Sequence, residues 1–143
     1  MVVNVQAASG GAHLPLQGAR LVYGYGPDVS MAGQGVPSGR ARRVAGYVIT
    51  GRWSYGSGIH HAEWVHSGCL VMEGDQPVLG ADGAPEIVVV HHPKSSITVL
   101  GNWDVLALRG TGSFDYTIAD GKLFVPIYRT RGPIGTGSQL TPR

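Results

Sequence analysis

The amino-acid sequence predicts an all-β fold, namely a single-domain antiparallel β-sandwich or small β-barrel with an irregular N-terminal region and an extended C-terminal arm. Glycine supplies 23 of the 143 residues and proline supplies 9, and no stretch free of both is longer than nine residues. An α-helix averages about 11 residues and accommodates neither glycine nor proline well in its interior. The remaining short runs are rich in valine, isoleucine and aromatic residues and are separated by turn residues, as in sandwiches and barrels.

One hydrophobic core is expected. A chain of 143 residues suits a single domain that buries roughly two thirds of the surface exposed by its unfolded form. We assign residues 1–130 to this domain. Residues 131–143 are dominated by glycine, proline and threonine and are expected to form the C-terminal arm.

The first part of the chain offers two candidate strands and a long connection. Residues 1–8 are expected to form a strand or an arm, and Arg20–Tyr25 is expected to form a strand. Residues 26–42 contain four glycines, two prolines and two serines, which predicts a long loop. A loop of that length in a compact domain is usually functional or mobile.

The clearest strand is Val44–Trp53, where apolar and polar residues alternate with the period of a half-buried strand. The turn Tyr55–Gly58 follows it. We expect this turn to bring Ile59–His66 back against Val44–Trp53 as a β-hairpin.

The rest of the chain contains six further candidate strands and one clear turn, Gly80–Pro85. The run Ile87–Val90 is continuously apolar, which indicates a strand buried on both faces. The last four runs are expected to form a meander, with Pro126 placing the last at a sheet edge or a bulge. The six runs are Cys69–Glu73, Ile87–Val90, Ile97–Leu100, Trp103–Leu108, Phe114–Ile118 and Leu123–Tyr128.

Charge is distributed unevenly along the sequence. Residues 1–62 carry five arginines and one acid, residues 63–120 carry eight acids and two bases, and residues 121–143 carry four bases and no acid. Such a pattern indicates either a polyanionic partner or copies of one chain that dock basic segments on the acidic centre of a neighbour. The candidate partner-contact residues are Arg40, Arg42, Arg43, Arg129, Arg131 and Arg143.

Histidines form the candidate chemical site, since five of the six fall in two clusters. If residues 59–66 are extended, His61 and Glu63 share one face, and His60 and His66 share the other. A site for a single Zn, Fe, Ni or Cu ion would combine histidines and a carboxylate from two strands. Its predicted ligands are His61, Glu63, His91 and His92. Histidines that hydrogen-bond at strand ends are the alternative.

Other classes of protein fit the sequence less well. No run of about 18 apolar residues predicts a membrane span, and no signal peptide is visible at the N-terminus. A location in the cytoplasm or in a virion fits both observations. A net charge of +2 with an acidic centre argues against nucleic-acid binding. The single cysteine, Cys69, cannot form an internal disulfide and is expected to be a buried apolar residue.

The favoured functional hypothesis is a structural assembly protein without a cofactor. It would self-associate or dock on a larger oligomer, as a virion component such as a capsid decoration or a tail or fibre subunit. In this hypothesis the basic segment 129–143 contacts the acidic region 63–120 of the next copy. The alternative is a small β-barrel enzyme or ligand-binding protein with a pocket lined by histidine and glutamate, with or without a metal ion.

Overall fold

The computed structural model describes residues 14–24, 26, 28–44, 46–101, 103–104, 106, 109–123 and 127–130. These residues are mostly β-strand with one α-helix, which confirms the predicted all-β class. The strands are β1 (Met31–Val44), β2 (Gly46–Gly56), β3 (Trp64–Glu73), β4 (Gln76–Pro77), β5 (Ile87–Pro93), β6 (Thr98–Val99), β7 (Phe114–Leu123) and β8 (Ile127–Thr130). The helix is α2 (Leu16–Tyr23), and three short 3-10 turns lie at Ile59–His61, Lys94–Ser96 and Arg109–Thr111.

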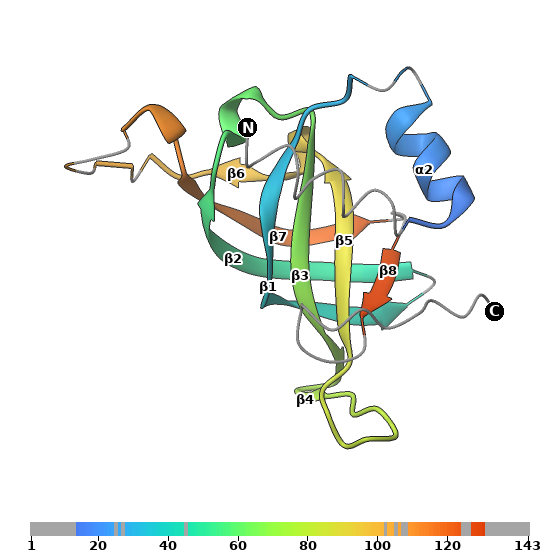
Figure 1. Ribbon diagram of the computed structural model, residues 1–143. Helices are drawn as coiled ribbons and strands as arrows, with labels where there is room; N and C mark the ends of the chain where they lie inside the picture. Colours follow the sequence, from blue (N-terminus) through green and yellow to red (C-terminus); the bar gives the residue numbers. More distant parts are fainter. Residues whose placement is uncertain are drawn as a thin grey trace.

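All eight strands belong to one sheet in the order β6-β7-β2-β1-β3-β5-β8, with β4 paired to β3. In the described part of the chain β6 and β8 lie at opposite ends of this order, so the sheet is not a closed barrel. Figure 1 shows β1, β3 and β5 running side by side while β2 and β7 cross them, so the sheet bends over on itself. The sandwich-or-barrel alternative is therefore replaced by one open, strongly bent sheet.

The prediction of purely antiparallel pairing is wrong at the centre of the sheet. Strands β1 and β3 pair in parallel, from Met31 opposite Trp64 to Arg42 opposite Met72. The chain between them contains the whole of β2, which pairs antiparallel with β1. A parallel pair needs a long crossover connection, and here β2 and the turn after it supply that connection.

Helix α2 contradicts both the expectation that helices are nearly excluded and the predicted strand Arg20–Tyr25. Gly18 and Val22 are its buried residues and lie four positions apart, so they share one face of the helix. That face packs near the start of β1, where Leu14, Val22 and Met31 form a small core with Trp64 against it. Burial of this face favours the helix despite the unfavourable propensity of Gly18.

The predicted loop over residues 26–42 is wrong, because most of it is β1. Two of its four glycines, Gly33 and Gly39, lie where strands approach closely. A Cβ on Gly33 would lie 2.0 Å from the His66 carbonyl oxygen, and a Cβ on Gly39 would lie 2.2 Å from the Trp53 ring. A register shift between Gln34 and Gly39 marks a bulge in the pairing with β3. Glycine here permits close strand contact and bending of the sheet, as well as turns.

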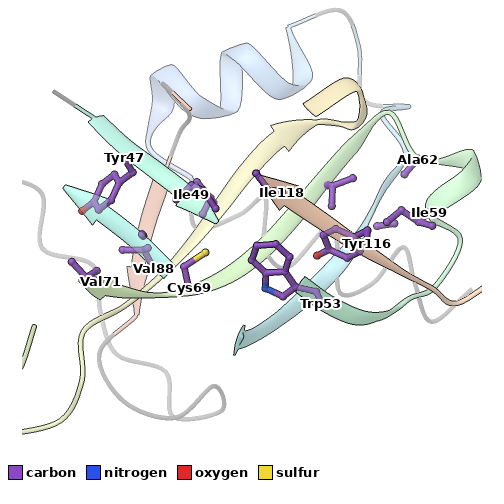
Figure 2. Close-up of a cluster of buried hydrophobic side chains, with 14 residues drawn as sticks. Tyr47, Ile49, Trp53, Ile59, Ala62, Cys69, Val71, Val88, Tyr116 and Ile118 are labelled. Atoms are coloured by element: carbon purple, nitrogen blue, oxygen red, sulfur yellow. The ribbon is translucent and has the colours of Figure 1, made fainter. Parts of the chain in front are cut away.

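The main core fills the inside of the bend (Figure 2). Trp53 is fully buried, its ring stacks on Tyr116 with a centroid distance of 5.3 Å, and its Nε1 donates a hydrogen bond to the Gly68 carbonyl oxygen at 2.8 Å. Cys69 lies in this core as predicted, and burial raises the pKa of its thiol to about 12. A thiol with so high a pKa is a poor nucleophile.

Two of the predicted strands are close to the observed ones. Val44–Trp53 corresponds to β2, and Ile87–Val90 is the buried centre of β5. Cys69–Glu73 is the second half of a longer strand, β3. The turn at Gly80–Pro85 is confirmed.

The predicted pairings fared less well. Ile59–His66 does not pair with β2, because its first part is a 3-10 turn and its last part belongs to β3, which pairs with β1, β4 and β5. The expected meander is also wrong: β6 pairs with β7, but β8 pairs with β5 at the far end of the sheet. The described residues of Trp103–Leu108 form no strand. Residues 1–8, Pro126 and the arm 131–143 lie outside the described residues. In the described part of the chain, no helix is long and apolar enough to cross a membrane.

Candidate functional site

The histidine-rich stretch 59–66 forms a corner at one end of the sheet. Gly58 has a left-handed backbone conformation and starts the 3-10 turn Ile59–His61. Ile59 is buried and anchors this turn in the core, while His60 and His61 are exposed. The His60 ring packs edge-on against Phe114 at the start of β7, with a centroid distance of 4.5 Å.

Hydrogen bonds tie this corner to the start of β1 and the end of β5. The Ser30 N–H donates to the Glu63 carboxylate at 3.2 Å, and the Ser30 hydroxyl donates to the His61 carbonyl oxygen at 2.9 Å. The Lys94 N–H donates to the Glu63 carbonyl oxygen at 2.9 Å, and the Lys94 ammonium donates to the His60 carbonyl oxygen. Glu63 therefore holds together three segments that are distant in sequence.

The four predicted metal ligands do not converge in this structure. His61 and Glu63 are exposed at the corner, whereas His91 and His92 are fully buried in β5. His91 and His92 are consecutive strand residues, so their side chains point to opposite faces. The described residues contain no group of three or more His, Cys, Asp or Glu side chains that could hold a metal ion. The metal site stays a prediction to which this geometry adds no support.

The half-buried His66 and the fully buried His91 form a pair that the sequence did not indicate. They are opposite each other in the antiparallel pairing of β3 and β5, and their ring centroids are 6.1 Å apart. Burial, and to a smaller extent the neighbouring His66 and His92, lower the pKa of His91 to about 3. Burial also lowers the pKa of His66 to about 4, against an opposing backbone hydrogen bond at Ala32. Both imidazoles are therefore neutral at pH 7.

His92 lies on the opposite face of β5 and joins a buried chain of hydrogen bonds. Its Nδ1 is 3.0 Å from the Ser96 hydroxyl, and its Nε2 is 2.9 Å from the Ser67 hydroxyl. The Ser67 hydroxyl is 3.0 Å from the Tyr116 hydroxyl, which donates to the His66 carbonyl oxygen at 3.1 Å. This chain links the 3-10 turn Lys94–Ser96 with β5, β3 and β7.

A second cluster of hydroxyl groups lies at the end of β2. We call the residues Tyr55–Gly58 and Thr111–Ser113 together the hydroxyl turn. The Ser113 hydroxyl is 2.7 Å from the Ser57 hydroxyl and 3.0 Å from the Thr111 hydroxyl, and the Gly58 N–H donates to the Thr111 carbonyl oxygen at 3.0 Å. Two segments far apart in sequence thus present hydroxyl groups at one place on the surface.

Tyr55 gives the hydroxyl turn its unusual backbone. It has a φ of 63° and is the positive-φ residue other than glycine in the described part of the chain. Its side chain is 67% exposed. A left-handed conformation at a residue other than glycine costs about 1–3 kcal/mol, and such strain clusters at functional sites. An exposed aromatic ring held in this way can stack on a planar ligand.

The Tyr55–Gly58 segment is supported from below by the main core. A Cβ on Gly56 would lie 2.9 Å from Ile59 and 3.1 Å from the Tyr116 ring, so only glycine lets the turn lie this close to the core. The sequence Tyr55-Gly56-Ser57-Gly58 predicted a turn but not its contact with Thr111–Ser113. Its density of glycine and hydroxyl residues next to an aromatic residue was the available signal.

The predicted partner-contact arginines are dispersed. Arg40 and Arg42 are exposed on β1, and Arg43 forms an ion pair of 2.6 Å with Glu86. The backbone of Arg129 lies in β8 opposite Val88, while Arg131 and Arg143 lie outside the described residues. The set remains a prediction.

No protein-family model matches the sequence, but several characterised enzymes are similar to it. It is 33% identical over 110 residues to a pigment production hydroxylase of Rhodococcus erythropolis, covering 76% of this chain and 27% of the relative. It is 36% identical over 110 residues to an indole-3-acetate monooxygenase of Pseudomonas putida, covering 76% of this chain and 26% of the relative. It is 32% identical over 109 residues to the oxygenase subunit HsaA of a flavin-dependent monooxygenase from Rhodococcus jostii, covering 76% of this chain and 26% of the relative.

Solved structures of similar enzymes share the fold. The crystal structure of the 3-HSA hydroxylase from Rhodococcus sp. RHA1 superposes with a TM-score of 0.71 at 30% identity, covering 82% of this chain and 30% of the other. XiaF from Streptomyces sp., solved in complex with FADH2 and glycerol, superposes with a TM-score of 0.67 at 28% identity, covering 82% of this chain and 29% of the other.

These similarities overturn the leading functional hypothesis. The similar proteins are hydroxylases and flavin-dependent monooxygenases, so the prediction of a structural virion protein or capsid decoration is wrong. The misleading observations were the expected flexible C-terminal arm, the uneven charge and the lack of a complete catalytic constellation in the sequence. Gly33 and Gly39, which lie in the predicted loop, serve close strand packing in the sheet. The chain spans about a quarter of the length of the relatives that it matches.

Proposed function

We propose that this chain is the β-sheet part of the oxygenase component of a flavin-dependent monooxygenase. The observation that carries the proposal is the agreement between sequence and structure. Relatives that are 32–36% identical and a solved structure with a TM-score of 0.71 are both hydroxylases or monooxygenases. The sheet fold alone would carry no function, because one fold serves many chemistries.

We place the flavin-facing surface at the hydroxyl turn. A flavin ring has two flat aromatic faces and a polar edge, so it needs an aromatic or apolar stacking partner and hydrogen-bond donors in one plane. Tyr55 offers an exposed ring, and Ser57, two residues further along the chain, offers a half-buried hydroxyl. The exposed aromatic ring and the hydroxyl group therefore fit the ring of a flavin.

A bound reduced flavin supplies the electrons with which a monooxygenase activates oxygen. The residues of this chain would bind and orient the ring. The strained backbone at Tyr55 fixes the direction of its side chain, and the hydroxyl pair Ser57 and Ser113 fixes the position of donors. The fully buried Trp53 and Tyr116 beneath the turn keep it rigid, as a site for ordered chemistry requires.

The complete enzyme is proposed to need further polypeptide. The relatives are about four times as long as the segment matched here, so the sheet would supply one wall of the site and other chain segments the remaining walls. HsaA is an oxygenase subunit, which supports work with a second protein. Association with other copies of the chain remains part of the proposal.

The test is flavin binding by the purified protein. FAD and FMN, oxidised and anaerobically reduced, are titrated and followed by absorbance and equilibrium dialysis. Tyr55→Ala and Ser57→Ala should each weaken binding by about tenfold, which corresponds to about 1.4 kcal/mol. Leu79→Ala is the matched control, because Leu79 is also exposed but lies in the projecting loop beside β4 (Figure 1). Absence of binding at millimolar flavin, or equal weakening by all three substitutions, would contradict the proposal.

A further inference from the structure

The hydrogen-bond chain around His92 contains more contacts than hydrogens when the imidazole is neutral. It has five contacts: Ser96 to the Pro93 carbonyl, Ser96 to His92, His92 to Ser67, Ser67 to Tyr116, and Tyr116 to the His66 carbonyl. Each hydroxyl contributes one hydrogen and a neutral imidazole contributes one. The chain then has four hydrogens for five contacts.

Both ends of this chain are fixed as acceptors. The Pro93 and His66 carbonyl oxygens can only accept, so Ser96 and Tyr116 must donate outwards to them, at 2.8 Å and 3.1 Å. The Gln34 N–H also donates to the Tyr116 hydroxyl, at 3.2 Å, and fills an acceptor position without supplying a hydrogen to the chain. Hydrogens are thus drawn towards both ends, and His92 is the group in the middle that can supply another.

A doubly protonated His92 completes the chain. Its Nδ1–H then donates to Ser96, which donates to the Pro93 carbonyl, and its Nε2–H donates to Ser67, which donates to Tyr116 and so to the His66 carbonyl. All five contacts are satisfied in one consistent direction. Hydrogen bonding to the charged form of a group favours that form. Burial opposes it and lowers the pKa of His92 to about 4, with backbone hydrogen bonding at Pro93 acting in the other direction.

From this count of hydrogens and contacts we infer that protonation of His92 completes a hydrogen-bonded link between the 3-10 turn Lys94–Ser96 and strand β7. We call this link the His92 clasp. Uptake of one proton at His92 converts an incomplete chain into a complete one. The clasp is connected to the corner formed by residues 59–66, because the Lys94 N–H in the same 3-10 turn donates to the Glu63 carbonyl oxygen. The inference does not depend on the proposed monooxygenase function.

The other charged groups near the clasp are accounted for. Two carboxylates close to it in the fold are already engaged, Glu63 with Ser30 and Asp115 with Arg52. No acidic side chain is among the groups that shift the pKa of His92. The hydrogen-bond contacts, rather than an acidic counter-ion, therefore decide how the neutral and protonated forms of His92 differ. The described titratable and charged groups on the elements packed around it are His66, Cys69 and Glu73 on β3, His91 on β5, Lys94 in the 3-10 turn, Tyr47, Arg52 and Tyr55 on β2, Asp115 and Tyr116 on β7, and Arg40, Arg42 and Arg43 on β1.

Shortening the chain at either end should remove the need for the second hydrogen. In Ser96→Ala, a neutral imidazole with Nε2–H satisfies the three contacts that remain. In Tyr116→Phe, a neutral imidazole with Nδ1–H satisfies the other three. The two variants should therefore favour opposite tautomers of His92. In both, the pKa of His92 should fall by about 0.5–1 unit, because protonation no longer gains a hydrogen bond.

The experiment is NMR of protein labelled with ¹⁵N-histidine, whose ring nitrogens distinguish the two tautomers and the imidazolium. His92→Gln assigns the signals, and Ser95→Ala is the matched control, since Ser95 lies in the same 3-10 turn but is exposed. At pH 8 we expect Nε2–H in Ser96→Ala, Nδ1–H in Tyr116→Phe, and no change in Ser95→Ala. If Tyr116→Phe does not fold, Ser67→Ala also predicts Nδ1–H. The same tautomer in both shortened chains, or a His92 pKa equal to that of the control, would overturn the inference.

Discussion

His91 and His92 are neighbours in sequence and equally buried, yet the two faces of β5 give them different surroundings. His91 faces His66 across the β3–β5 pair, and the neighbouring His66 helps to lower the pKa of His91. His92 faces Ser67 and Tyr116 and has a hydrogen-bond partner at each ring nitrogen. The comparison shows that burial is the main reason why both rings are neutral at pH 7, while their hydrogen-bond partners decide how well a proton is accommodated at lower pH.

The largest expected effect is acid destabilisation by the buried histidines. Their pKa values are lowered from 6.5 to about 4 for His66 and His92 and to about 3 for His91. The unfolded chain therefore binds more protons than the folded chain below pH 6.5, and stability falls as the pH falls from 6.5 towards 4. At pH 5 the loss should be about 1–2 kcal/mol for each histidine.

Urea denaturation at pH 7.5 and pH 5 measures this loss. His91→Asn should reduce the loss of unfolding free energy between pH 7.5 and pH 5 by the contribution of one histidine. His61→Asn, at an exposed residue, should leave this loss unchanged. Equal stability at the two pH values would show that the histidines are not held neutral by the fold.

The next largest effect on the free energy of unfolding should come from the main core, inside the bend of the sheet. Trp53→Ala removes a fully buried ring together with its stacking on Tyr116 and its hydrogen bond to Gly68. We expect a loss of about 3–5 kcal/mol in the free energy of unfolding. Leu106→Ala, at a fully exposed side chain, should change it by less than about 0.5 kcal/mol. A similar loss in both variants would mean that the core does not lie where Figure 2 shows it.

Gly39→Ala should have an intermediate effect in the same core. Its Cβ would lie 2.2 Å from the Trp53 ring and 2.9 Å from the Cys69 sulfur, so the ring must move. Overpacking of this kind costs about 1–3 kcal/mol. Gly101→Ala is the control, because nothing lies within 4 Å of its Cβ position. Thermal unfolding of both variants measures the difference, and an unchanged midpoint for Gly39→Ala would argue against the close strand packing.

The smallest effect should come from the surface ion pair of Arg52 and Asp115. The Arg52 side chain is 61% exposed, so solvent screens the pair and its loss in Arg52→Ala should cost about 0.2–1 kcal/mol. The loss should shrink further in 1 M salt. A cost above 2 kcal/mol, measured by urea denaturation, would show that the pair has a structural role beyond its charge.

Local pattern predicted those parts of the fold that local residues decide. Alternation in Val44–Trp53 and the apolar run Ile87–Val90 located β2 and the centre of β5, because the side-chain period of a strand follows from its backbone geometry. The turn Gly80–Pro85 and the burial of Cys69 were predicted for similarly local reasons. The glycines of β1 misled, since glycine lowers strand propensity wherever it occurs, while its benefit here comes from Trp53 and His66 on other strands.

The candidate site shows the same division between what local sequence predicts and what contacts between distant residues decide. The sequence identified His61, Glu63, His91 and His92 as residues with chemical potential, but strand pairing separates them into an exposed corner and two buried faces. The hydroxyl turn was missed because Ser57 and Ser113 are 56 residues apart. The sequence by itself determined the β-rich class, the single cysteine in the core and the places of several strands and turns. Only the tertiary structure decided the parallel β1–β3 pairing, the helix α2 and the surroundings of each histidine, because these depend on contacts between residues far apart in the chain.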